Sequence, residues 1–231
     1  MFVPSSNHHL RSLKDTPRRL LPVLAPFEIV WSWIVEQTVA PQAPPYVVDI
    51  ESAASILKSA ERILVIGCSG GGKSTLSQKI CGRLDLPYVS MDRNFFWLPG
   101  WVKRDKAEER ALIAAKVAEE RWLIDGTAPS SFDLRLPRTE LVLWVHMPRW
   151  LCMRGALSRA VRWLGRSRPD MAPGCRERID GEFLRYIWDW ERKFAPKVLA
   201  GLAQHGPHVP VFQLKSRGEM RQLLDLLGRP A

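Results

Sequence analysis

The chain has 231 residues, a length that suits one α/β domain or one domain with appendages. Its hydrophobic content of 46% is ordinary for a globular protein, and no charge-free apolar stretch is long enough to cross a bilayer. The net charge of +10 and the pI near 9.8 favour an anionic ligand, either a nucleic acid or a polyphosphate.

Residues 1–45 are rich in proline and lack a sustained hydrophobic period, so we expect a poorly ordered N-terminal extension. Within it, residues 27–35 could form a short amphipathic helix before a cluster of prolines breaks the chain. Residues 1–21 lack the apolar core of a signal peptide, which argues against secretion.

From Tyr46 to the C-terminus, short apolar runs alternate with amphipathic segments, which predicts a single domain over 46–231. The predicted strands are Ile63–Gly67, Leu86–Met91, Trp122–Asp125, Glu140–His146 and Val209–Leu214. Helices are predicted near 74–84, 104–120, 149–164, 176–204 and 217–227. Right-handed crossovers would give a five-stranded parallel sheet with helices on both faces and ligands beyond the carboxyl ends of the strands.

The segment Gly67–Ser74 reads GCSGGGKS and matches the phosphate-binding loop pattern G-x-x-x-x-G-K-[ST]. It lies between a predicted strand and a predicted helix, so backbone amides and the helix N-terminus would converge on an anion. Lys73 would reach the β- and γ-phosphates of ATP, and the Ser74 hydroxyl would hold Mg²⁺. The expected nucleotide-binding residues are Gly67, Ser69, Gly70, Gly71, Gly72, Lys73, Ser74 and Thr75.

Charged residues follow the next two predicted strands. Asp92 and Arg93 precede an aromatic cluster over 95–101, and could bind the phosphoryl acceptor; the alternative is a helix cap followed by core aromatics. Asp125 ends an apolar strand as a Walker B carboxylate does, and would organise Mg²⁺ together with Ser74. His146 ends the fourth strand, where a hydrogen-bonded core imidazole is preferred over a nucleotide contact.

Arginines are concentrated after the fourth strand. Between Arg149 and Lys197, basic residues outnumber acidic ones twelve to six. Arg154 and Arg159 are the candidates for stabilising charge during phosphoryl transfer, on a lid over about 160–180, although a solvated basic helix face remains an alternative. Arg135 could bind the acceptor or the donor phosphates, or cap a helix.

Several longer segments resemble the adenylate-kinase-like P-loop proteins known as DNA topology modulation proteins. The resemblance covers about residues 62–227. Its segments are ILVIGCSGGGKSTL, MDR with WLPGW, WLIDG, FDLRLPR, PRWLC and RPDMAPGC. It implies a nucleoside-monophosphate-kinase fold, Mg-ATP at the P-loop and an arginine-bearing lid. The chain departs from the family at Thr127-Ala128, where Asn-Tyr is usual, and at His146, where Asp is usual.

We therefore expect a Mg-ATP-dependent kinase that transfers the γ-phosphoryl group to a small, nucleotide-like acceptor. One alternative is a regulatory or nucleic-acid-associated ATPase, and another is a nucleotide-binding protein with degraded catalysis. No membrane partner is expected. The four cysteines have no metal-binding spacing, which, with a nucleotide site, suggests a reducing cytoplasmic location.

Overall fold

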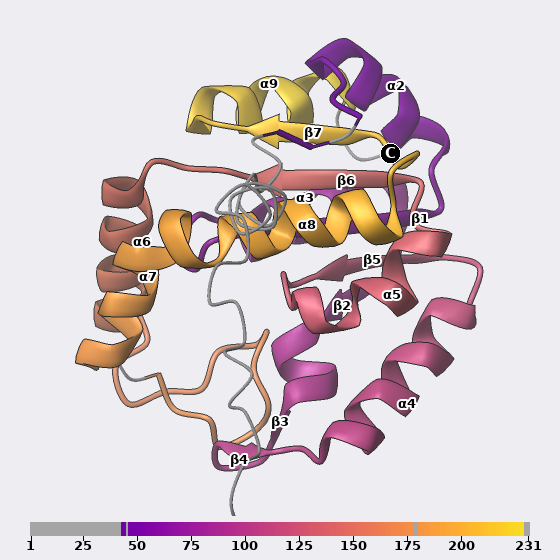
Figure 1. The fold of residues 1–231 in the computed structure, drawn as a ribbon. Coiled ribbons are helices and arrows are strands. Elements are labelled where there is room, and N and C mark those ends of the chain that lie inside the picture. Colours follow the sequence, from indigo (N-terminus) through magenta and orange to yellow (C-terminus); the bar gives the residue numbers. More distant parts are fainter. Residues whose placement is uncertain (1–42, 45, 178–179, 229–231) are drawn as a thin grey trace, which may run out of the picture. The chain divides into compact units, whose positions relative to one another are not determined.

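The computed structural model describes residues 43–44, 46–177 and 180–228, which belong to one compact unit. The predicted 1–45 extension thus lies almost wholly outside the described residues, and so do two residues of the predicted lid. Five strands form one all-parallel sheet with the order β2-β5-β1-β6-β7 (Figure 1). They are β1 Arg62–Gly67, β2 Tyr88–Ser90, β5 Trp122–Asp125, β6 Leu141–Val145 and β7 Val211–Leu214. The predicted fold class is confirmed.

Helices cover both faces of this sheet. α3 and α9 pack together on one face, with α2 beside α9, and α5 and α8 lie on the other (Figure 1). Helices can pack on both faces of the sheet because its central strands are apolar on both sides; for example, all five residues of β6 are buried. The α-helices are α2 Ile50–Ser59, α3 Lys73–Leu84, α4 Lys106–Ala118, α5 Phe132–Arg135, α6 Arg149–Arg162, α7 Gly181–Lys193, α8 Ala195–His205 and α9 Arg217–Leu226. In the described part of the chain, none is long and apolar enough to span a membrane.

Several parts of the architecture differ from the sequence prediction, and α5 and the short strands β3 (Trp97–Leu98) and β4 (Val102–Lys103) are among the elements that were not predicted. The helix predicted over 176–204 is two helices, α7 and α8, because the chain turns at Phe194 and Pro196 occupies the first turn of α8. The helix α2 was not predicted. It begins at the cap Asp49, whose carboxylate accepts from the Ser52 amide at 2.7 Å, and it buries one apolar face.

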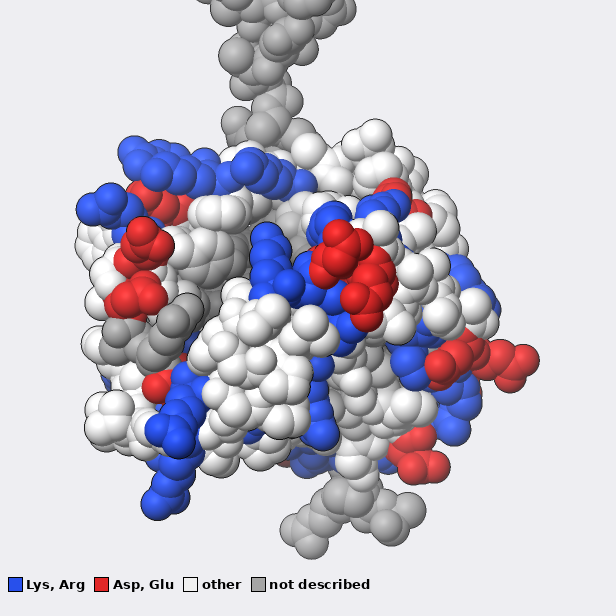
Figure 2. Space-filling view, turned by 90° about the horizontal axis from the view of Figure 1, so that it is seen from below, with Lys and Arg blue, Asp and Glu red and all other residues white. Residues whose placement is uncertain are grey.

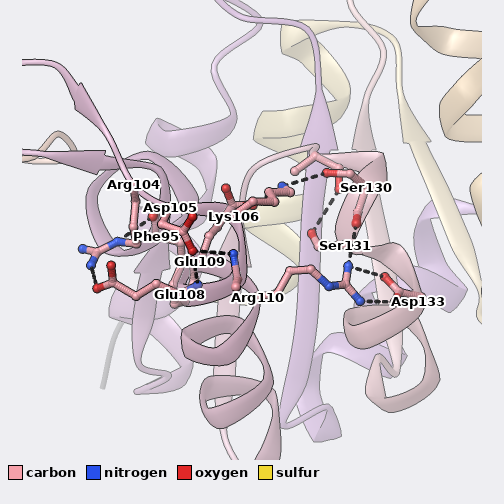
Figure 3. A network of polar contacts seen from close by, with 12 residues as sticks. Phe95, Arg104, Asp105, Lys106, Glu108, Glu109, Arg110, Ser130, Ser131 and Asp133 are labelled. Carbon is pink, nitrogen blue, oxygen red and sulfur yellow. Dashed lines mark hydrogen bonds and ion pairs between the residues drawn. The ribbon is translucent and has the colours of Figure 1, made fainter.

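A short insertion follows β2 and forms one wall of the site described below. It consists of the π-helical turn η1 (Asp92–Phe96) and the antiparallel hairpin of β3 (Trp97–Leu98) and β4 (Val102–Lys103). Arg104 fixes the insertion to α4, since its Nε donates to the Phe95 carbonyl oxygen at 2.9 Å (Figure 3). Arg110 continues this network to the loop before α5 by donating to the Ser130 carbonyl oxygen at 2.9 Å.

Candidate functional site

The P-loop connects β1, at the centre of the sheet, to the N-terminus of α3. Gly70 and Gly72 have φ angles of 78° and 100°, which side-chain-bearing residues rarely adopt. Gly72 caps α3 without a side-chain hydrogen bond, so the amides of the first turn are available to an anion. Lys73 begins the helix, and its Nζ donates to the Cys68 carbonyl oxygen at 3.0 Å. The loop therefore has the form that a phosphate-binding site needs.

Hydrogen bonds on one side and close helix packing on the other hold the P-loop in place. The Thr127 hydroxyl donates to the Gly67 carbonyl oxygen at 2.8 Å and accepts from the Gly67 amide at 2.9 Å. On the other side α6 packs against the loop so closely that a Cβ on Gly155 would lie 2.1 Å from the Gly70 carbonyl oxygen. Thr127, where the chain departs from the resembled family, thus stabilises the P-loop.

Asp125 is buried at the end of β5, beside β1. The Tyr88 hydroxyl donates to its Oδ2 at 3.1 Å, while its Oδ1 is buried without a hydrogen-bond partner among the described residues. Burial raises the pKa of Asp125, against the opposing effects of Lys73 and the Ser74 hydroxyl. A buried, unsatisfied carboxylate oxygen next to a cation and a hydroxyl fits a hydrated divalent cation.

A cleft of about 710 Å³ opens beyond the carboxyl ends of the strands. The P-loop lines it with Ser69, Gly70, Gly72, Lys73, Ser74 and Thr75, and Asp92 and Asp125 line it as well. Part of Asp92 is accessible to solvent in the cleft, but desolvation by the surrounding protein raises the pKa of its carboxyl group, and Lys73 is the strongest opposing charge. The structure therefore brings together the predicted P-loop residues, Asp92 and Asp125. Gly67 and Gly71 shape the loop without lining the cleft.

Two arginines of the cleft are held by one buried carboxylate. Glu177 is 8% exposed, and it accepts from Arg159 Nε at 2.9 Å and pairs with Arg168 Nε at 2.6 Å. Arg168 also donates to Asp170 at 2.8 Å. Both arginines use Nε toward Glu177, and Arg168 also uses Nη1 toward Asp170, so both Nη groups of Arg159 and Nη2 of Arg168 remain for a ligand in the cleft.

The segment from Trp163 to Glu177 closes over the insertion after β2. A small second core joins Met171, Ala172 and Cys175 to the partly buried Trp97 and Trp101 of the hairpin. The backbones are also linked, since the Gly100 amide donates to the Pro173 carbonyl oxygen at 3.2 Å. The predicted lid region is thus docked on the hairpin.

Three predicted site residues lie outside the cleft. Arg154 is exposed and stacks on the Trp150 ring at 5.5 Å, because five residues of helix place it about 140° from Arg159. Arg93 is exposed and donates to the Pro169 carbonyl oxygen at 2.8 Å. Arg135 is fully buried and donates to the carbonyl oxygens of residues 126, 127 and 128, so it shapes the loop after β5 and does not reach a ligand.

The sequence reasoning missed Arg217 and Glu177. Arg217 follows β7 and lies over the P-loop, where its Nη1 is 2.1 Å from the position that a Cβ on Gly72 would take. Its place after a strand end was the available signal. His146 lies outside the cleft, stacks on Trp144 and hydrogen-bonds Glu191 at 2.8 Å. It is therefore a hydrogen-bonded imidazole as preferred, but it is partly exposed and not a core residue.

An all-parallel sheet of this strand order, with a P-loop after its central strand, defines the chain as an α/β protein of the P-loop class. No protein-family model matches the chain, and no curated protein matches its sequence.

Solved structures with a similar fold include three shikimate kinases. The enzyme from Bacteroides thetaiotaomicron is 18% identical, covers 73% of this chain and 96% of its own, and has a TM-score of 0.44. The Acinetobacter baumannii enzyme, solved in complex with shikimate, is 13% identical, with 74% and 93% covered and a TM-score of 0.45. The Aquifex aeolicus enzyme is 14% identical, with 71% and 92% covered and a TM-score of 0.38.

Proposed function

We propose that the protein is a Mg-ATP-dependent kinase that transfers the γ-phosphoryl group to a small molecule. The observation that carries this proposal is the convergence of the P-loop, Lys73 and a buried carboxylate at the head of one cleft. A binding site for a nucleotide alone would not need the further room and polar groups that the rest of the cleft provides.

The donor would bind along the P-loop. The first-turn amides of α3 and Lys73 would hold the β- and γ-phosphates, and Arg217, whose guanidinium lies against Gly72, would add positive charge. Ser74 and Asp125 would hold Mg²⁺ through its ligands or waters, and the ion would neutralise charge on the phosphate oxygens. Among the described residues there is no cluster of three or more protein ligands, which suits an ion held mainly by phosphates and water.

The acceptor would enter between the P-loop and the insertion after β2. Asp92 lines this part of the cleft, and its side chain forms no hydrogen bond with the described residues, so its carboxylate is available to a hydroxyl group. Arg159, anchored by Glu177, would direct its Nη groups at the transferred phosphoryl group. The lid and the hairpin would together exclude water during transfer.

The proposal is tested by replacing Lys73 with Ala. We expect ATP consumption with a productive acceptor to fall by about 100-fold or more, since the charge that binds the phosphates is lost. Lys79→Ala is the matched control, because Lys79 is exposed on the same helix and does not line the cleft. Equal turnover in the two variants would refute the assignment, provided that circular dichroism shows both to be folded.

A nucleic-acid-associated ATPase is the second candidate, and the net charge of +10 favours it. On the face shown in Figure 2, Lys and Arg side chains lie among Asp and Glu and do not form one uniform patch. Duplex binding with a steep salt dependence, combined with ATP hydrolysis that needs no small acceptor, would select this candidate.

A further inference from the structure

Two of the four cysteines lie side by side behind the P-loop. Cys68 follows the first glycine of the loop, and Cys152 is on α6. The Cys152 Sγ lies 3.8 Å from the position that a Cβ on Gly71 would take, and the Cys68 carbonyl oxygen lies 3.1 Å from the same point. The two cysteine side chains hydrogen-bond each other. Both residues are buried, and neither is among the residues that line the cleft.

The surroundings favour the thiolate form of one member of this pair. The hydrogen bond from the Cys68 thiol lowers the pKa of Cys152, and the positive charges of Lys73 and Arg217 act in the same direction, although burial opposes them. The same hydrogen bond, together with burial, raises the pKa of Cys68. Cys152 is thus the more oxidisable sulfur, and it has a second thiol in contact with it, which is the arrangement typical of redox-sensitive sites.

The other two cysteines have different surroundings. Cys81 lies on α3, where burial raises the pKa of its thiol to about 12. Cys175 lies in the small core of the lid segment and the hairpin, and its thiol donates to the Leu98 carbonyl oxygen at 3.6 Å. These two thiols are therefore internal references for the reactivity of the pair.

The backbone of Cys68 holds the phosphate-binding part of the loop. Its carbonyl oxygen accepts from Lys73 Nζ at 3.0 Å and from the Gly71 amide at 3.3 Å. The Cys152 carbonyl oxygen lies only 2.1 Å from the position of a Cβ on Gly70, so the loop and α6 are already in close contact. A covalent bond between the sulfurs would draw the two backbones closer, and the packing leaves no room for this. The loop must then shift, and it would carry Lys73 and the phosphate-binding amides with it.

Resting on the proposed kinase function, we propose that Cys68 and Cys152 form a regulatory disulfide that weakens nucleotide binding when the protein is exposed to a peroxide. Hydrogen peroxide takes two electrons from the Cys152 sulfur, which becomes a sulfenic acid, and one water leaves. The Cys68 sulfur then attacks the Cys152 sulfur, the S–O bond breaks, and a second water leaves with the proton of the Cys68 thiol. Two thiols and one peroxide thus give one disulfide and two waters, and a dithiol reductant reverses the change.

The test treats the full chain with hydrogen peroxide and maps its disulfides by mass spectrometry of unreduced peptides. We expect a peptide that links Cys68 to Cys152 as the main oxidation product, while Cys81 and Cys175 stay reduced. The Kd for Mg²⁺ with a non-hydrolysable ATP analogue, measured by calorimetry, should rise by about tenfold or more and return to its first value with dithiothreitol. Absence of the linked peptide, or a linked peptide with an unchanged Kd, would overturn the inference.

Cys152→Ala separates the disulfide from other oxidative damage. This variant cannot form the bond, so its Kd for the analogue should stay within about threefold of that of the unaltered reduced protein, with or without peroxide. Cys81→Ala is the matched control, because it keeps the pair and should still lose affinity after oxidation. Cys152→Ser takes the place of Cys152→Ala if circular dichroism shows the latter to be unfolded. An equal loss of affinity in the oxidised Cys152 variant would contradict the inference.

Thermodynamic linkage gives a second, independent check. At saturation, the analogue should lower the equilibrium constant for disulfide formation, measured in glutathione buffers, by the same factor by which the disulfide raises the Kd. An equilibrium constant that does not respond to the analogue would refute the coupling. Absence of nucleotide binding by the reduced protein would refute the kinase function and the regulation with it, whereas normal binding without a linked peptide would refute only the regulatory disulfide.

Discussion

Asp125 is buried, and its Oδ1 atom has no hydrogen-bond partner among the described residues. Such an oxygen lowers the stability of the folded state, but it can bind a cation. We expect Asp125→Asn to raise the free energy of unfolding by about 1 kcal/mol in metal-free buffer at pH 7, and to abolish Mg-ATP turnover. The Asn oxygen can still accept from Tyr88. Chemical denaturation and an ADP assay on the same preparations measure both effects.

The pH dependence of this stability gain follows from the sign of the pKa shift. The folded state raises the pKa of Asp125 above its ordinary value of 3.8, so it binds the proton more tightly than the unfolded state. The unaltered protein therefore loses stability as the pH rises from about 4 through the folded pKa. The gain in Asp125→Asn should grow over this window and vanish at lower pH; a gain independent of pH would contradict this explanation.

Arg135 shows how a side chain expected at a ligand can instead support the site. Its guanidinium donates to three consecutive carbonyl oxygens, of which those of Gly126 and Ala128 belong to residues with φ angles of 146° and 28°. Arg135→Met would remove the donor to the carbonyl oxygens of residues 126 and 127, whereas that of Ala128 would still accept from Ser131, and the change should lower the free energy of unfolding by roughly 3 kcal/mol. Arg138→Met, which removes one exposed bond to the Ala118 carbonyl oxygen, should cost below about 1 kcal/mol in the same denaturation assay.

The contact between α6 and the P-loop depends on the absence of a side chain at Gly155. A Cβ there would lie 2.1 Å from the Gly70 carbonyl oxygen, so Gly155→Ala must displace the loop or the helix. We expect a loss of roughly 2 kcal/mol in stability and weaker Mg-ATP binding by calorimetry.

Gly82→Ala is the matched control within α3. Gly82 is exposed, and a Cβ at this position would meet nothing within 4 Å. This variant should gain about 0.5–1 kcal/mol from the better helix propensity of Ala. Similar effects of the two substitutions would show that helix propensity, and not the contact with the P-loop, governs Gly155.

The elements of the sheet could be predicted because local patterns determine them. Trp122–Asp125 has the predicted bounds, since a buried strand reads as a continuous apolar run. The residues whose positions differ from the prediction depend on the phase of a helix or on contacts with distant parts of the chain. Arg154 was assigned to the wrong side of α6 through its helical phase, and the burial of Arg135 depends on how α5 packs beneath the loop after β5. Nothing local to Glu177 predicts that it pairs with Arg159, eighteen residues earlier.

At the scale of the described domain, the lid segment and the hairpin behave as one unit because they share a small core of their own. This core is separate from the main core, which the sheet forms with the helices on both its faces, and it contains Met171 with the hairpin tryptophans. A small core provides little stabilisation, so the unit should open locally more easily than the sheet. Opening would expose the acceptor side of the cleft while β1 and the P-loop stay folded.

Met171→Ala should therefore loosen both parts at once. Removing the side chain from this core costs on the order of 1–2 kcal/mol, which would speed amide hydrogen exchange by about tenfold in 165–177 and in the hairpin, and leave β1 unchanged. The KM for the acceptor should rise more than the Kd for Mg-ATP, because the P-loop does not contact this core. Leu164→Ala is the control, since that side chain is 77% exposed in the same part of the chain. If exchange quickens in the lid segment alone, the hairpin is held by α4 through Arg104 and not by the shared core.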